Sequence, residues 1–313
     1  MSGKPSLTGL SIRMAAKRDN GGQKKQTASA AERLARKLEK REKQRAANIV
    51  RASEMHAERI AFKAPAAETD RKLESFNIGC SGWFYWHWRG GFYPDEMPTK
   101  SWFSHYASNF PTVELNAPFY SWPTVKTVKE WLRQTEGKGF VYAVKVCELI
   151  THVKRMSRSR TLVKDFGLIA DLLGEKMGCF LFQLPPSYHY SAARLKTLLG
   201  QLDPARRNVV EFRHKSWWNE RVYAAFRKTG TIFCSCSGPR LPDELVKTAD
   251  EVYIRFHGLT KWYRHDYTDE ELQVWVRRIR GSGCKRVWAY FNNDRDGHAI
   301  RNAKEFTRQL REL

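Results

Sequence analysis

Long apolar segments are missing from this sequence of 313 residues. No run approaches the roughly 18 apolar residues of a membrane-spanning helix, which excludes an integral membrane protein of that kind. Nor does the N-terminal region contain the apolar run of about 7–15 residues that a secretory signal needs. The six cysteines are scattered, and only Cys234 and Cys236 are close, without the second pair that a zinc site requires. These absences predict free thiols and a cytoplasmic protein with no membrane partner.

Acidic residues are scarce as well. Asp and Glu number 33 against 55 Lys and Arg, which gives a formal net charge of +22. A balance of this kind favours acidic partners, such as nucleic acid or phosphorylated ligands. Hydrophobic residues make up 42% of the chain, enough for a sizeable core. The composition does not predict an oligomeric state.

Aromatic residues are almost absent from the first 75 residues, where Phe62 is the only one among the 40 of the chain. The same segment holds 18 Lys and Arg and 9 Asp and Glu, a composition that cannot bury enough surface to fold alone. We therefore expect a basic tail over 1–75 and a folded domain over 76–313. Residues 1–27 are expected to be disordered, and 28–64 to form a solvated basic helix that ends at Pro65. Docking of this tail on nucleic acid is the alternative.

The folded domain alternates short apolar runs with amphipathic segments. The expected strands are Phe76–Gly82, Thr112–Pro118, Phe140–Cys147, Cys179–Leu184, Asn208–His214, Thr231–Ser235, Glu251–His257 and Arg286–Asn292. The expected helices are Thr124–Thr135, Arg160–Leu173, Ser191–Leu202, Asn219–Thr229, Thr268–Arg280 and His298–Leu313. Strands that alternate with helices pair in parallel, and eight of them predict an α/β fold, the (β/α)8 TIM barrel. Only the connection after the sixth strand lacks a convincing helix.

Alternation along the strands predicts a polar ring inside the barrel. In several strands apolar residues occupy one face and polar residues the other, near the C-terminal end, where barrel enzymes hold their active sites. The ring expected by this alternation is Ser81, Glu114, Asn116, Lys145, Gln183, Glu211, Arg213, Ser235, Arg255, His257 and Asn292. Three cations face two carboxylates, with His257 undecided. A bound phosphate or carboxylate would offset the excess charge, and internal salt bridges are the alternative.

Several motifs in this domain resemble those of one family. They are Gly79-Cys80-Ser81-Gly82-Trp83, Val113-Glu114-Leu115-Asn116, Gln183-Leu184-Pro185-Pro186, Glu211-Phe212-Arg213-His214, Arg255-Phe256-His257-Gly258 and Phe291-Asn292-Asn293. Together they are similar to the YecE-like family of unknown function. The resemblance implies a TIM barrel over 76–313, related in shape to the xylose isomerase and endonuclease IV group. It implies no settled reaction, and Cys80 departs from the threonine common in the family.

The first hypothesis is a protein that binds a phosphate-bearing substrate at the barrel mouth, with hydrolysis of that substrate as its enzymatic form. Cationic Lys145, Arg213 and Arg255 would hold the phosphate. A carboxylate, Glu211 or Glu114, would act as general base, and His257 or His152 as acid or orienting group. Further substrate contacts are expected from Ser81, Asn116, Gln183 and Asn292, with Trp83 and Trp217 stacking on a base or sugar.

Two other functions stay open. A non-catalytic nucleic-acid-binding protein would use the basic tail and the aromatic rim. A glycosidase would use the two glutamates, although the cationic neighbours favour anions over a neutral sugar. The cofactor is unknown: a divalent metal is possible with His152, His214 and His257 nearby, but no H-E-x-x-H spacing favours it.

Overall fold

The computed structural model describes residues 29–63 and 75–312, so the segment 1–27 expected to be disordered lies outside the described residues. The chain divides into two compact units, 1–41 and 42–313. In the first unit the described residues form the start of helix α1, Ala30–Ala61, and the side chains of residues 31–41 are exposed. Among the described residues, no helix is long and apolar enough to cross a membrane.

The second unit is built on eight parallel strands in a nearly closed barrel. They are β1 (Phe76–Cys80), β2 (Thr112–Leu115), β3 (Val141–Lys145), β4 (Met177–Gln183), β5 (Asn208–Glu211), β6 (Ile232–Ser237), β7 (Glu251–Phe256) and β8 (Arg286–Phe291). The strand order is β1-β8-β7-β6-β5-β4-β3-β2. All eight expected strands form, and the predicted (β/α)8 barrel is confirmed.

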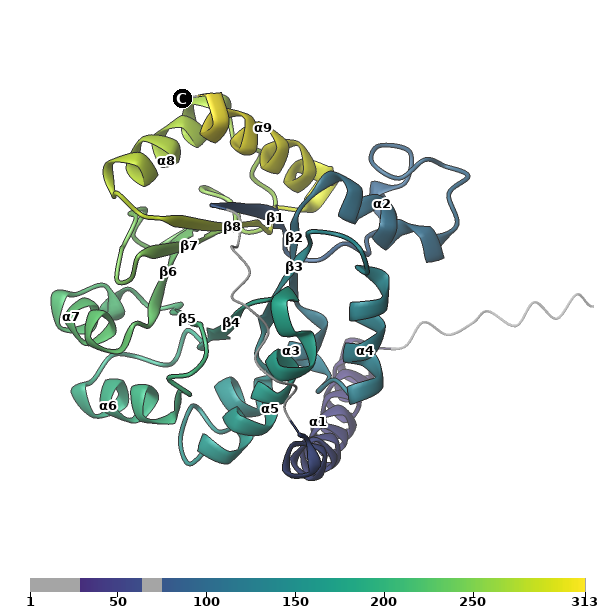
Figure 1. The fold of residues 1–313 in the computed structure, drawn as a ribbon, viewed down its shortest axis with the longest axis vertical. Helices are drawn as coiled ribbons and strands as arrows, with labels where there is room; N and C mark the ends of the chain where they lie inside the picture. Colours follow the sequence, from purple (N-terminus) through teal and green to yellow (C-terminus); the bar gives the residue numbers. More distant parts are fainter. Residues whose placement is uncertain (1–28, 64–74, 313) are drawn as a thin grey trace, which may run out of the picture. The chain divides into compact units, whose positions relative to one another are not determined.

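Helices surround the strands (Figure 1). They are α2 (Trp102–Asn109), α3 (Ala117–Tyr120), α4 (Val125–Gln134), α5 (Arg160–Leu173), α6 (Ala192–Gln201), α7 (Glu220–Thr229), α8 (Asp269–Gly281) and α9 (His298–Glu312). Helix α8 begins with a capping box, in which the Thr268 hydroxyl accepts from the Glu271 backbone and the Glu271 carboxylate accepts from Thr268. No helix forms over residues 238–250 between β6 and β7, as the sequence predicts.

The second half of α1 differs from the expected tail. Within the barrel unit its residues Asn48, Ala52 and Met55 are buried. The Asn48 amide donates to the Tyr120 carbonyl at 3.0 Å, and its oxygen accepts from the Trp122 backbone at 2.9 Å. The prediction of a separate tail therefore does not hold for residues 42–61. The sequence shows little sign of this docking, because the contact between α1 and the barrel uses one amide and the two apolar residues Ala52 and Met55 in a helix otherwise rich in charge.

The barrel interior below the mouth is largely apolar. It contains Val141, Ala143, Cys179, Leu181, Val209, Ile232, Cys234, Cys236, Tyr253, Trp288 and Tyr290. The predicted alternation is correct for most strands but wrong for β6, whose interior residues are Cys234 and Cys236. Ser235 faces away, and its hydroxyl accepts from the Val246 backbone at 2.9 Å. Since cysteine and serine alternate in this strand, neither face had the charge that marked the interior elsewhere.

Candidate functional site

A single arginine connects two carboxylates at the C-terminal ends of the strands. Arg255 in β7 donates from Nη1 to Glu211 Oε2 at 2.5 Å and from Nη2 to Glu114 Oε1 at 2.6 Å. The two glutamates, in β5 and β2, are completely buried, and the Arg255 side chain is 1% exposed. Charge-assisted bonds in such surroundings hold all three side chains in fixed directions.

Other polar residues complete this interior network. Glu211 also pairs with Arg213 Nε at 2.5 Å and with His257 Nε2 at 3.1 Å. Further contacts join the Glu114 carboxylate to the Tyr253 and Ser81 hydroxyls, the Asn116 amide to the Ser81 carbonyl, and the Asn292 amide to His257 Nδ1. Gln183 lies half-buried at the end of β4, in register with Glu211. The structure thus brings the predicted ring together, with Ser235 as the exception.

Internal ion pairs balance most of the charge in this network. Arg213 and Arg255 face Glu211 and Glu114, so the expected alternative of internal salt bridges describes the interior better than an excess of cations. Burial alone would raise the pKa of Glu211, but the two arginines hold that pKa well below its ordinary value. Burial and the same arginines lower the pKa of His257 well below its ordinary value, so this imidazole is neutral. A carboxylate held this way is a weak proton acceptor, which does not favour Glu211 as general base.

One group of potential metal ligands lies in the same network. Ligand atoms of Glu211, Cys236 and His257 lie within 4.8 Å of one another, and Cys236 Sγ is 3.7 Å from Glu211 Oε1. The carboxylate already pairs with Arg213 and Arg255, whose charges would repel a divalent cation at this distance. The residues present therefore do not fit a metal ion.

A pocket of about 890 Å³ opens at the mouth beside Arg213. It is lined by Pro186, Arg213, His214, Lys215, Pro239, Arg240, Leu241, Trp262 and Tyr263. The Arg213 guanidinium lies 4.8 Å from the centre of the Trp262 ring. Arg240 and Tyr263 have left-handed backbones, with φ of 67° and 65°. Strained backbone of this kind gathers at functional sites, and here it shapes two sides of one pocket.

The predicted aromatic contacts are only partly available. Trp217 is completely buried, with its ring stacked on Phe212 at 4.0 Å, so no face remains for a ligand and the predicted stacking role is wrong. Trp83 is half-buried and packs edge-on against Phe103 at 5.1 Å. The exposed aromatic rings after β1 are instead those of Phe84 and Trp86. A tryptophan that follows a strand can pack in the core as readily as it can lie exposed at the barrel mouth.

Sequence reasoning missed the charged and aromatic pocket residues Lys215, Arg240, Trp262 and Tyr263, and also Pro239 and Leu241. Two of them, Trp262 and Tyr263, stand five residues or more beyond the expected end of the seventh strand. Strand alternation cannot place loop residues, because it applies only to extended backbone. The usable signal was two adjacent aromatics with cationic neighbours, Lys261 and Arg264, after a strand.

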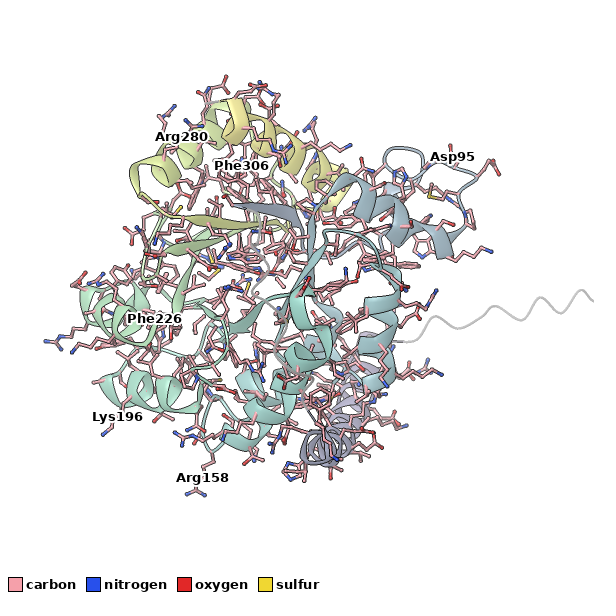
Figure 2. All side chains as sticks on the ribbon, viewed as in Figure 1. Asp95, Arg158, Lys196, Phe226, Arg280 and Phe306 are labelled. Carbon is pink, nitrogen blue, oxygen red and sulfur yellow. The ribbon has the colours of Figure 1, made fainter. Side chains whose placement is uncertain are left out.

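Lys145 and His152 lie around one phenyl ring beside the network. Lys145 ends β3, and its Nζ is 4.1 Å from the centre of the Phe119 ring. The His152 ring is 4.9 Å from the same ring and lies in a π-helical turn, Leu149–Val153, where Nδ1 is 2.9 Å from the Thr151 hydroxyl. Farther along this loop, Arg158 extends away from the barrel (Figure 2).

A model of the family described as "Protein of unknown function DUF72" matches residues 77–313. The chain belongs to the DUF72 family. The UPF0759 protein YunF of Bacillus subtilis is 25% identical to it over 272 residues, which cover 74% of this chain and 94% of YunF. The crystal structure of a DUF72 protein from Thermotoga maritima is similar, with a TM-score of 0.68 and 26% identity over 76% of this chain and 99% of that one.

A second DUF72 structure, from Enterococcus faecalis, has a TM-score of 0.65 and 19% identity, over 76% of this chain and 96% of that one. At this identity the likeness shows the fold alone. These comparisons confirm the predicted family and barrel. None of these names states a substrate or a reaction, so the function of this DUF72 barrel must be argued from its site.

Proposed function

We propose that this DUF72 protein binds a phosphate-bearing ligand, a nucleotide or a nucleic-acid segment, in the mouth pocket. The observation that carries the proposal is the charge of the lining. Arg213, Lys215 and Arg240 line the pocket, and none of the described residues in its lining is Asp or Glu. Arg213 is already paired with Glu211, so the additional positive charge at the pocket is that of Lys215 and Arg240, which are exposed.

The aromatic side of the pocket supports a ligand with a flat ring. Trp262 lies under the Arg213 guanidinium, and the Tyr263 side chain is 45% exposed. Base or sugar rings stack on such faces, while guanidinium and ammonium groups hold phosphate oxygens. The Tyr263 backbone donates to the His257 carbonyl at 2.6 Å, which connects this face to the interior network.

Hydrolysis is a further step of the same proposal, and it has less support. Glu114, Glu211 and His257 are completely buried, so a water molecule would reach them only after the network opened. Burial and the arginines lower the pKa of His257, so this imidazole is neutral but, like the Glu211 carboxylate, a weak proton acceptor. The glycosidase alternative is not favoured either, because Arg255 bridges the two carboxylates that would have to flank a glycosidic bond.

One observation favours the nucleic-acid alternative. Phe84 and Trp86 are 48% and 61% exposed after β1, and the Arg89 guanidinium lies 5.8 Å from the centre of the Trp86 ring. Exposed aromatics beside a cation are typical of surfaces that stack on single strands. Such a surface would extend binding beyond one nucleotide.

The test is isothermal titration calorimetry of the full chain with phosphate, AMP and a short single-stranded oligonucleotide. In the variant Lys215→Ala/Arg240→Ala we expect at least about tenfold weaker binding of AMP, because two charged contacts are lost, each of about 1 kcal/mol or more. Both side chains are exposed, so the fold should survive. The matched control is Lys196→Ala on α6, where the side chain points to solvent (Figure 2).

Unchanged affinity in the double variant, or no binding of any of the three ligands, would refute the mouth pocket as a phosphate site. Binding of the oligonucleotide that weakens in Trp86→Ala but not in the double variant would favour the alternative surface after β1. We expect the oligonucleotide affinity to fall steeply with salt if phosphates provide the contacts.

A further inference from the structure

Lys145 stands apart from the other interior cations. It ends β3, and its side chain is only 7% exposed. Arg213 and Arg255 each pair with a glutamate, whereas no carboxylate of the described residues lies within ion-pair distance of Lys145 Nζ. Its Nζ lies over the Phe119 ring, 4.1 Å from the ring centre.

The carboxylates near Lys145 are already occupied. Glu211 accepts from Arg255 and His257 and pairs with Arg213. The oxygens of Glu114 accept from Arg255, Tyr253 and Ser81. The interior thus places an amine on an aromatic face, within the electrostatic influence of Arg255 and Arg213, and no carboxylate of the described residues pairs with it.

These surroundings favour the uncharged amine. Burial, followed by the charge of Arg255, lowers the pKa of Lys145 to about 7, with a further decrease from Arg213 and opposing increases from Glu211 and Glu114. A large share of Lys145 is therefore neutral at neutral pH. A neutral amine is a poor holder of phosphate, which argues against the predicted role of Lys145 as an anion-binding residue, and it is a good nucleophile.

The loop after β3 has an unusual backbone conformation of the kind found at functional sites. It begins with the π-helical turn Leu149–Val153, a rare conformation that is frequent at functional sites. Three residues with left-handed backbone follow, Arg155, Met156 and Arg158, with φ of 51°, 59° and 48°. Strain at three non-glycine residues persists only where the surrounding structure requires it. This loop places the His152 ring against Phe119, on which Lys145 lies.

We propose that Lys145 is a nucleophilic amine that forms an imine with the aldehyde or ketone carbonyl of a phosphate-bearing ligand. Only the phosphate part rests on the function proposed above. Neutral Nζ attacks the carbonyl carbon, and a proton passes from nitrogen to oxygen to give a carbinolamine. Loss of one water molecule leaves the C=N bond, so the step needs no oxidant or reductant. Lys145 does not line the mouth pocket and is only 7% exposed, so a ligand whose phosphate is held in the pocket must extend its carbonyl into the interior to reach Nζ.

Reductive trapping tests this proposal on the full chain. The protein is incubated at pH 7 with glycolaldehyde phosphate and cyanoborohydride, which reduces an imine to a stable secondary amine, and the modified peptides are mapped by mass spectrometry. A pKa lowered from 10.5 to about 7 raises the neutral fraction at pH 7 by roughly a thousandfold. We expect Lys145 to be labelled at least about tenfold more than the exposed Lys196. This ratio is set below the thousandfold gain in neutral amine because buried Lys145 is less accessible and an amine of lower pKa is less nucleophilic.

The site is assigned in the wild-type protein, so the test does not depend on a variant that folds. The variant Lys145→Met carries no charge, like the neutral amine, and removes the nucleophile, so it should abolish this adduct, while Lys196→Met should leave it unchanged. Labelling of Lys145 should rise with pH through about 7, as its pKa requires, rather than through the usual range of lysine.

A parallel reaction with uncharged glycolaldehyde separates the two proposals. Equal trapping of both aldehydes at Lys145 would support the imine and contradict a phosphate site that serves it. If phosphate binds in the calorimeter but Lys145 is labelled no more than Lys196, the imine proposal is refuted while the phosphate site is supported. Preferential trapping of the phosphorylated aldehyde would support both.

Discussion

Replacement of Arg255 by methionine tests whether the interior network is one energetic unit. The side chain donates to Glu211 at 2.5 Å and to Glu114 at 2.6 Å, and all three side chains are buried. Methionine fills much of the same volume but offers no donor and no charge. Two carboxylates would then remain in the barrel interior with one guanidinium, that of Arg213, in place of two.

The size of the effect follows from these contacts. Removing one partner of a buried ion pair costs about 3–5 kcal/mol, because the other charge stays buried without compensation. The loss of two bonds to charged groups, at about 1.5–3 kcal/mol each, gives a similar range. Since whole domains are stable by about 5–15 kcal/mol, Arg255→Met should still fold but unfold at much lower denaturant. In Arg255→Met/Glu211→Gln, removal of one buried charge should recover about 1–3 kcal/mol.

The assay is urea denaturation followed by circular dichroism, at pH 7 and at a series of acid pH values that extends well below 4.5, the usual pKa of glutamate. In the wild-type protein the pKa of Glu211 is held below its usual 4.5, so this stabilisation is present above pH 4.5 and is lost as the pH falls through the lower, folded-state pKa. The difference between wild type and variant should therefore be largest at pH 7 and shrink in acid. A loss below about 1 kcal/mol at pH 7 would refute the reasoning, as would a loss independent of pH.

Two further predictions concern packing. The variant Asn48→Ala should lose about 2 kcal/mol of stability, since its bonds to the Tyr120 carbonyl and the Trp122 backbone disappear. A thermal unfolding temperature within about 1 °C of the wild-type value would show that α1 is not docked there. In Gly178→Ala the new Cβ would lie 2.8 Å from the Trp288 ring and 2.9 Å from the Tyr142 carbonyl, so we expect about 1–3 kcal/mol of destabilisation by denaturant titration; a variant as stable as wild type would contradict this close approach.

The fold was predictable because its signals are local and repeated. Each strand is a short apolar run, and caps such as Thr268 with Glu271 start the helices. The docking of α1 was not predictable by the same means. Its contact depends on one buried amide, that of Asn48, whose partners are about 70 residues away in the sequence. No periodic pattern marks such a contact, so composition alone assigned this helix to the tail.

The interior of the site was predictable and the pocket was not. Alternation in extended strands placed Glu114, Glu211 and Arg255 on one face, and the structure joins them. Alternation could not show which charges pair, because pairing depends on the register between strands that are distant in the sequence. The lining of the pocket comes largely from loops, where Trp262 and Arg240 have no periodic signal.

The charged interior is itself an argument for function. Barrel interiors are usually filled with branched apolar residues, and a buried ion pair is often no more stabilising than apolar packing of the same volume. Stability alone does not explain why Arg255 and two glutamates fill the C-terminal end of this barrel. The network does fix the orientation of its side chains, and the pair with Glu211 holds Arg213 against the Trp262 ring. Because the carboxylates are engaged by the arginines, Lys145 has no carboxylate partner among the described residues. Preorganised groups of this kind are what binding and catalysis require, so the network should be required for ligand binding beyond its effect on stability.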